Sequence, residues 1–363
     1  MKPSRLRAWM VWTRIAPILG LVLLAATWSG KPGAILLAVA GLFLIASVLA
    51  AVHHAEVVAH RVGEPFGALV LAVAVTVIEV ALIVTLMVSD ASDTDTLARD
   101  TVFAAVMITC NGVVGLSLLV GALRRRFAEF NAEGTATALA TVITLATLSL
   151  VLPEFTTSRP GPEFTGAQLG FVAVVSLVLY GLFVFNQTVR HRESYVEEET
   201  EVVGGDSGPV PERSEALASL ALLVVSLVAV VGLAKVESPA IEDMVEAIGA
   251  PQSAVGVVIA LLVLAPETLA AVRNARRDRI QSSFNLALGS AMASIGLTIP
   301  VIALASIWLE GPLVLGLEPT QIVLLGLTAV VSALTILPGR ATLQEGGVHL
   351  VLFGAFLFLA INP

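Results

Sequence analysis

Two glutamates stand alone inside long apolar stretches of the sequence. Glu79 lies near the middle of the run 66–88, in "VTVIEVALIV", and Glu267 is the only interior charge of "VIALLVLAPETLAAV" in the run 252–272. A helix needs about 20 apolar residues to cross the hydrocarbon of a bilayer, so both runs predict membrane spans. A carboxylate at that depth costs about 3 kcal/mol or more, and such residues usually have a function. The chemistry open to two buried carboxylates is the binding of protons or of a cation.

The composition is that of a membrane protein. The chain is 57% hydrophobic and 13% charged, whereas soluble domains hold roughly 25% charged residues. A single cysteine, Cys110, excludes an internal disulfide framework. The basic start and the apolar run after it resemble a signal peptide. Further spans follow at once, so we expect a retained first transmembrane helix.

Eleven apolar runs follow one another along the chain. We expect each to be a helix, because an open strand would leave backbone polar groups unpaired in lipid. If the N-terminus is cytoplasmic, 16 of the 20 Lys and Arg residues fall in inside segments, which is a positive-inside signal. The C-terminus then lies outside, and the plasma (inner) membrane is the expected location. The runs are about 12–29, 33–52, 66–88, 101–123, 135–152, 167–187, 215–234, 252–272, 282–308, 320–337 and 346–361.

The order of the spans predicts an inverted repeat after an extra N-terminal helix. Two halves with an odd number of spans each, here five, have opposite topology, which is the plan of many secondary transporters. Glu79 and Glu267 both lie in the second span of their half, so we expect them at similar depth on either side of a pseudo-two-fold axis. The expected parts are the extra helix (1–32), the first repeat (33–187), an acidic cytoplasmic linker (188–214) and the second repeat (215–363).

Small and polar residues mark the spans that follow the two glutamates. Asn111 and Gly115 are i,i+4 neighbours on one face of "TCNGVVGL", and Ser290 and Ser294 have the same spacing in a later span. Such residues permit close helix approach or local unwinding.

A proline directly precedes the second glutamate. Because Pro266 has no N–H, the carbonyl of Leu262 loses its usual helical partner. A freed carbonyl one turn before Glu267 is a suitable ligand for a hard cation, although a simple packing kink is the commoner outcome.

At these residues the sequence resembles the cation/proton antiporters of the calcium/cation exchanger superfamily. It looks most like the bacterial calcium/proton branch, which includes sodium or potassium/proton exchange. The most specific stretches are "GEPFGALVLAVAVTVIEVALIV" and "LAPETLAAVRNARRDRIQSSFNLALGSAMASIGLTIPV", and the resemblance extends over nearly the whole chain. It implies ten core helices in two inverted repeats, an extra first helix, and a cation site between the third and eighth spans.

The sequence departs from the better-known calcium exchangers next to each glutamate. Those proteins have a Gly-Asn pair whose Asn helps to line the site, whereas Thr76-Val77 and Leu264-Ala265 stand here. Fewer side-chain oxygens therefore adjoin the carboxylates. Backbone carbonyls and four side chains are expected to compensate: Thr76, Asn111, Ser290 and Ser294.

The expected function is secondary active exchange of Ca²⁺ for H⁺ by alternating access. Mutual repulsion and desolvation both favour the neutral forms of two carboxyls that face one cavity, so protons or a cation must neutralise them. The empty, doubly charged site is costly to move, and that cost couples the two ion flows. Antiport of Na⁺ or K⁺ against H⁺ on the same scaffold is the alternative. Inorganic cations, protons and the lipid bilayer are the expected partners, with no cofactor and no nucleic acid, and the sequence leaves a homo-oligomer open.

Three other hypotheses compete with an exchanger. The two glutamates can be a structural pair, but interior carboxylates in membranes are usually functional. A channel predicts a continuous polar lining, which the sequence lacks. An enzyme is not expected, because there is no HExxH motif and Cys110 has no evident histidine partner. The histidines are expected at loops or span ends, and the acidic stretch 193–206 is expected to keep its loop soluble. Those histidines are His53, His54, His60, His191 and His349.

Overall fold

The structure is a computed structural model of the whole chain that describes residues 3–28, 32–63, 66–87, 95–195, 211–247, 249–308 and 312–363. The chain divides into two compact units, which are described separately below. Unit 1 comprises Met1–Ser92 and Glu201–Ala247, and unit 2 comprises Asp93–Thr200 and Ile248–Pro363.

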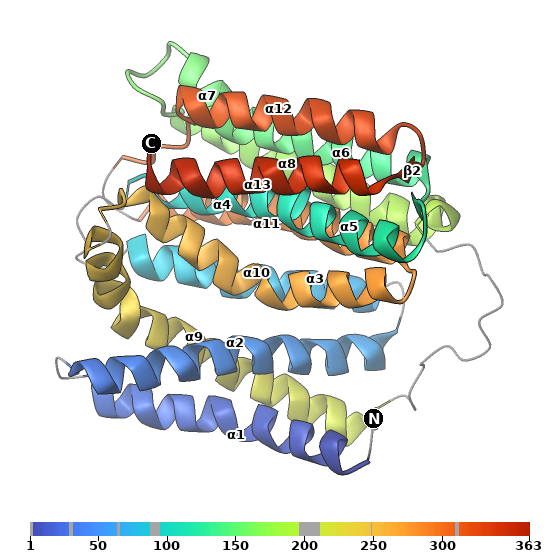
Figure 1. Cartoon of the computed structure of the whole chain (residues 1–363). Coiled ribbons are helices and arrows are strands. Elements are labelled where there is room, and N and C mark those ends of the chain that lie inside the picture. The colour runs from blue at the N-terminus through green and yellow to red at the C-terminus, as the bar shows by residue number, and fades with distance from the viewer. Residues whose placement is uncertain are drawn as a thin grey trace. The chain divides into compact units, whose positions relative to one another are not determined.

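Unit 1 consists of four helices: α1 (Pro3–Thr27), α2 (Ala34–Val62), α3 (Phe66–Met87) and α9 (Arg213–Ala247). They are drawn in blue and in yellow to olive in Figure 1. Helix α9 packs against each of the other three. Small residues bring the helices close together, because Gly20 of α1 lies against Ser47 of α2 and Ala229 of α9.

Unit 2 holds the remaining helices and a short two-stranded ribbon. Strand β1 pairs antiparallel with β2, with Ala128 opposite Ala341, and thereby joins two loops that are far apart in the sequence. In chain order the elements are α4 (Leu97–Met107), η1 (Ile108–Val113), α5 (Val114–Arg124), β1 (Ala128–Glu129), α6 (Ala132–Ala146), η2 (Thr147–Val151), α7 (Leu152–Phe155), α8 (Gly166–Phe185), η3 (Asn186–Arg190), η4 (Arg192–Ser194), α10 (Ser253–Arg276), α11 (Ile280–Ala305), α12 (Pro319–Ile336), β2 (Arg340–Ala341) and α13 (Leu343–Ile361).

Polar residues just before the helices fix where several of them start. The side chain of Asn131 accepts a hydrogen bond from the backbone of α6, and Thr165 does the same for α8. Helices α12 and α13 begin with capping boxes at Glu318 and Thr342, and Pro319 occupies the first turn of α12. Each cap satisfies backbone N–H groups that the first turn of a helix leaves without partners.

The predicted all-helical fold is confirmed, since the described residues form eleven helical segments that match the eleven apolar runs. Nine of these described helices are long and apolar enough to cross a membrane. Two of them continue well beyond the apolar run that predicted them. Helix α2 extends to Val62 and α9 to Ala247. Hydropathy marks only the part of a helix that can lie in hydrocarbon, whereas backbone hydrogen bonding continues into polar sequence.

Several spans contain a π-helical stretch, in which backbone hydrogen bonds join residues five apart in place of the four of an α-helix. The segments η1, η2 and η3 each continue an α-helix. The unwinding predicted for "TCNGVVGL" takes this form in η1, which includes Asn111. In contrast, α11 is a continuous α-helix, so local unwinding does not occur around Ser290 and Ser294.

The two compact units cut across the two sequence halves. Helices α2 and α3 of the first half and α9 of the second half belong to unit 1. The boundaries of the repeats at 33–187 and 215–363 therefore stay a prediction from the sequence. Most of the acidic stretch 193–206 lies outside the described residues.

Candidate cation site

Glu79 lies on the buried face of α3 in unit 1. It is 3% exposed, and Thr76, three residues earlier on the same face, is 4% exposed. The opposite face of the helix is open, because Val73 and Val77 are 40% and 44% exposed. Since α3 packs against α2 and α9, the predicted ligands Glu79 and Thr76 lie inside the helix packing.

Glu267 is buried in unit 2, where it is 8% exposed on α10. Pro266 lies inside this helix without ending it, so the carbonyl of Leu262 receives no backbone bond from residue 266. The neighbouring hydroxyl of Thr268 donates to the carbonyl of Leu264 at 2.8 Å. The hydroxyl nearest to Glu267 in sequence therefore serves its own helix.

Helix α11, which packs along α10, carries the two predicted serine ligands. Ser294 is 2% exposed and Ser290 is half-buried. Their spacing of four residues places both on one face of the continuous helix. Unit 2 thus brings together the helices of Glu267, Ser290 and Ser294.

A pair of serines that sequence reasoning missed holds α10, α11 and α5 together. The Ser283 hydroxyl of α11 donates to the carbonyl of Ala271 of α10 at 2.9 Å. The hydroxyl oxygen of Ser117 of α5 lies 2.6 Å from that of Ser283. Ala271 follows Glu267 by one helical turn, so these two hydrogen bonds fix α10 close to the carboxylate. Neither serine is charged or part of a motif, which is why neither was singled out.

Asn111 is fully buried. The nitrogen of its side-chain amide contacts α12, and the oxygen contacts α13. Its Nδ2 donates to the hydroxyl of Thr328 at 2.9 Å, and its Oδ1 lies 3.2 Å from Nδ1 of His349. An amide oxygen only accepts, so Nδ1 of His349 carries the proton and Nε2 accepts from Thr335 at 3.2 Å. The amide oxygen of Asn111 has two lone pairs, so it can accept from His349 and keep one lone pair for a cation.

The face shared by Asn111 and Gly115 was predicted correctly, since both contact α13. A Cβ added to Gly115 would lie 3.0 Å from Cβ of His349. His349 was predicted at a span end, and it lies in the second turn of α13. Its side chain is fully buried, and its two ring nitrogens pair with side chains from two other spans.

A small cavity adjoins His349 in unit 2. Cys110, Ser332, Thr335 and apolar side chains that include Phe284 line it, and its volume of about 10 Å³ is close to what one water molecule needs. Cys110 thus shares a cavity with a histidine, although the sequence offered it no evident partner. The Cys110 side chain is 1% exposed. Among the described residues, no group of three His, Cys, Asp or Glu side chains lies together as a metal site.

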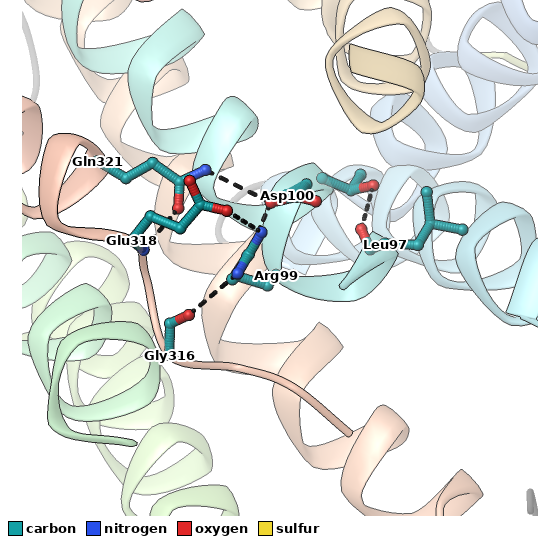
Figure 2. A network of polar contacts seen from close by, with 7 residues as sticks. Leu97, Arg99, Asp100, Gly316, Glu318 and Gln321 are labelled. Atoms are coloured by element: carbon teal, nitrogen blue, oxygen red, sulfur yellow. Dashed lines mark hydrogen bonds and ion pairs between the residues drawn. The ribbon is translucent and has the colours of Figure 1, made fainter. Parts of the chain in front are cut away.

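A buried ion-pair cluster fixes the start of α4 in unit 2 (Figure 2). Arg99 donates from Nε to Asp100 at 2.8 Å, from Nη1 to the carbonyl of Gly316 at 3.3 Å, and from Nη2 to Glu318 at 3.3 Å. Gln321 donates to the same Asp100 oxygen at 3.5 Å. Arg99 was expected in an outside loop, but it is 5% exposed because the cluster surrounds it.

In unit 1, His53 and His54 lie inside α2, because the helix continues beyond the predicted end of the span to Val62, whereas His60 lies in its last turn, as predicted. His54 is 2% exposed, and its Nε2 lies 3.1 Å from the carbonyl of Thr13 in α1. Pro17 follows Thr13 by four residues and has no N–H, so that carbonyl lacks its usual helical donor. The His54 ring replaces the missing N–H, which explains this histidine structurally.

The family profile described as "Sodium/calcium exchanger protein" matches residues 32–189 and 218–362, which include every candidate ligand. The chain belongs to this family. It is 46% identical over 356 residues to the putative ionic transporter y4hA of Sinorhizobium fredii, with 97% of this chain and 96% of that protein covered. It is 34% identical over 350 residues to the sodium-potassium/proton antiporter ChaA of Escherichia coli, with 94% of each covered.

The fold matches solved exchanger structures. The crystal structure of the H⁺/Ca²⁺ exchanger CAX superposes with a TM-score of 0.73 at 16% identity, over 97% of this chain and 88% of that chain. The predicted superfamily and the polytopic helical fold are therefore confirmed. The protein is a multi-pass membrane transporter of the cation exchanger type, and its family consists of transporters rather than enzymes.

Proposed function

We propose that this protein exchanges Na⁺ or K⁺ for protons by alternating access, with Glu79 and Glu267 as the carboxylates that bind either ion. One observation carries the proposal. Each of these glutamates is buried, at 3% and 8% exposure, in the interior of an apolar helix that the sequence predicts as a membrane span. Ionisable side chains at such positions face ion pathways far more often than they serve packing.

The chemistry follows from the cost of charge in an apolar interior. Two ionised carboxylates in one site repel each other and lose hydration, so the site is stable only when protons or a cation neutralise it. With one monovalent cation bound, one carboxyl gives up its proton and the other keeps it. The empty, doubly charged site is too costly to carry across the membrane, and exchange results.

Two observations favour a monovalent cation. The relative with 34% identity over 94% of the chain is named a sodium-potassium/proton antiporter. Next to each glutamate in the sequence, Thr76-Val77 and Leu264-Ala265 also stand where the better-known calcium exchangers have a Gly-Asn pair, so fewer side-chain oxygens adjoin the carboxylates along the chain. Ca²⁺ needs six to eight oxygens, which is a harder demand to meet here.

Ca²⁺ exchanged for two protons is the second candidate. It is favoured by the two carboxylates themselves, because a divalent ion neutralises both of them at once. Thr76, Ser290, Ser294 and the carbonyl of Leu262 would then supply further oxygens. The excess of Lys and Arg in inside segments supports an orientation with the N-terminus in the cytoplasm and the C-terminus outside.

Ion-driven proton flux in inside-out vesicles tests the proposal. A pH-sensitive dye reports the collapse of an imposed proton gradient after separate additions of Na⁺, K⁺ and Ca²⁺. Glu79→Gln and Glu267→Gln, which keep the shape of the side chain, are compared with the parent. Glu246→Gln on the exposed side of α9 is the matched control.

We expect Na⁺ or K⁺ to collapse the gradient in the parent and the control, and neither to do so in the two site variants. A response to Ca²⁺ alone would select the second candidate. If no cation moves protons in the parent, or if both site variants stay fully active, the two-glutamate mechanism is wrong.

A further inference from the structure

A carboxyl group besides that of Glu79 is buried in unit 1, on a helix that the exchange mechanism does not use. Glu237 of α9 is 8% exposed, and its Oε1 is buried. Within the part of the chain that the structure describes, Oε1 has no hydrogen-bond partner. The sequence placed this residue in an outside loop, but α9 continues through it to Ala247.

The carboxyl group faces a position on α2 that has no side chain. Gly41 lies opposite, and a Cβ added to it would stand 3.6 Å from Oε2 of Glu237 and 3.9 Å from Cδ. Around Gly41, α2 is apolar, with Ala40 and Leu44 buried. The group therefore lies in the contact between two packed helices, with hydrocarbon on the α2 side.

No positive charge is directed at Glu237 from its own helix. Lys235 lies two residues away and points elsewhere, with Nζ 5.6 Å from the centre of the Trp28 ring. Glu242 is bonded by the hydroxyl of Ser238 at 2.8 Å, and the remaining acids of this end of α9, Asp243 and Glu246, are exposed.

The helices packed against α9 bring no cation either. In α1, the stretch from Pro17 to Thr27 is uncharged, and the only ionisable residue of α3 is Glu79. The ionisable residues of α2 begin at His53, about 18 Å along the helix from Gly41. Among the residues that the structure describes, an ionised Glu237 would thus be buried without a counter-charge.

A proline lies in α9 close to this contact. Pro239 lies inside the helix and cannot bond to the carbonyl of Lys235, which weakens the backbone there. Figure 1 shows α9 changing direction in its olive C-terminal part. Glu237 is therefore close to a bend, where the packing of α9 on α2 can change locally.

We propose that Glu237 is a proton-binding site separate from Glu79 and Glu267, and that its proton is held while α9 packs on α2 at Gly41. A buried carboxylate without partners is far less stable than the neutral acid. Loss of the proton admits water or a cation and opens this contact. Proton binding stands on this geometry alone, and its effect on exchange rests on the proposed function.

Infrared difference spectroscopy of the full chain in lipid nanodiscs tests the site without any transport. The carbonyl stretch of protonated carboxyl groups is recorded through a pH titration for the parent, Glu237→Gln and the control Glu246→Gln. We expect Glu237→Gln to lack one protonated-carboxyl band that the parent and the control show at neutral pH. An identical set of bands in all three at neutral pH would overturn the proposal.

A second variant tests the contact with α2 directly. Gly41→Ser adds a hydroxyl donor beside Oε2, and such a bond stabilises the ionised form. The band lost in Glu237→Gln should then titrate at lower pH in Gly41→Ser, whereas an unchanged midpoint would show that the carboxyl does not face Gly41. The vesicle assay of Glu79 and Glu267 is separate, so failure of the exchange mechanism and failure of this site can be told apart.

Discussion

The two units hold their helices together by different means. In unit 2, polar side chains bond from one helix to another at several levels: Arg99 with Glu318, Asn111 with His349, and Ser283 with Ala271. In unit 1, α1, α2 and α9 meet at small and apolar residues such as Gly20 and Ala229, and His54 of α2 bonds to the carbonyl of Thr13 in α1.

The difference concerns how firmly each helix is held at one position along its neighbour. A hydrogen bond between two spans fixes how far one helix lies along the other, whereas an apolar contact tolerates a shift. Lipid is as apolar as such a contact, so helices in a membrane associate mainly by packing and by hydrogen bonds. We therefore expect unit 2 to behave as a fixed scaffold and unit 1 to allow its helices to slide. The variants below test this contrast by thermal unfolding in detergent.

The largest loss is expected when the Arg99 cluster is broken. Arg99→Met leaves Asp100, which is 3% exposed, as an unpaired buried acid, and the free energy of unfolding should fall by about 3–5 kcal/mol. The double variant Arg99→Met with Asp100→Leu should lose less, because no buried charge stays unpaired and the Glu318 side chain is 58% exposed. Equal losses in both would show that the arginine acts through packing alone.

Matched glycine substitutions compare the two units directly. A Cβ on Gly346 of α13 would lie 2.8 Å from the backbone nitrogen of Leu119, so Gly346→Ala must displace a helix and should cost about 1–3 kcal/mol. On Gly232 of α9 its three nearest atoms would all belong to the flexible side chain of Leu24. Gly232→Ala should therefore be nearly neutral, since alanine also favours the helix by about 1 kcal/mol. A larger cost at Gly232 would contradict the proposed mobility of unit 1.

A double-mutant cycle examines the bond between α1 and α2. His54→Phe removes the donor to the carbonyl of Thr13, and we expect a loss of about 1 kcal/mol. In a Pro17→Ala background the restored N–H can bond to that carbonyl, so the same substitution should cost markedly less. Additive losses would mean that His54 does not replace the missing helix bond.

The smallest effect is expected at Tyr195, the last residue of the described stretch 95–195 in unit 2. Burial, and secondarily the negative charge of Glu133, raises the pKa of the Tyr195 phenol above its usual value. The folded state then holds this proton at a pH where the unfolded chain has lost it. Stability should accordingly fall as the pH rises above about 10.

Tyr195→Phe removes that alkaline loss. At neutral pH it should change stability by no more than about 0.5 kcal/mol, because the buried hydroxyl has no hydrogen-bond partner among the described residues. Unfolding temperatures measured from neutral to alkaline pH test both statements. A parallel alkaline decline in the parent and the variant would exclude Tyr195 as the cause.

The spans were predictable because burial in lipid imposes one simple demand, which is a long apolar run. Their ends were not, since the polar stretch from Lys235 to Ala247 continues α9 by backbone bonding alone. The buried faces of Glu79 and Glu267 were also predictable, because a charge inside an apolar run must point away from lipid.

The sequence could not predict which side chains of different helices contact each other. The spacing of Asn111 and Gly115 predicted their common face correctly, yet not that this face meets α13. His349 and Asn111 are 238 residues apart, and only the packing of spans brings them together. The sharing of one cation by Glu79 and Glu267, with Thr76, Ser290 and Ser294 as further ligands, stays a prediction.

The burial of Cys110 has a practical consequence for experiments. It is the only thiol of the chain, and at 1% exposure it is shielded from aqueous reagents. Cysteines introduced at exposed positions of either unit can therefore carry spin or fluorescent labels in an otherwise unaltered protein. The same thiol, in the cavity beside His349, also provides a single S–H vibration from inside unit 2.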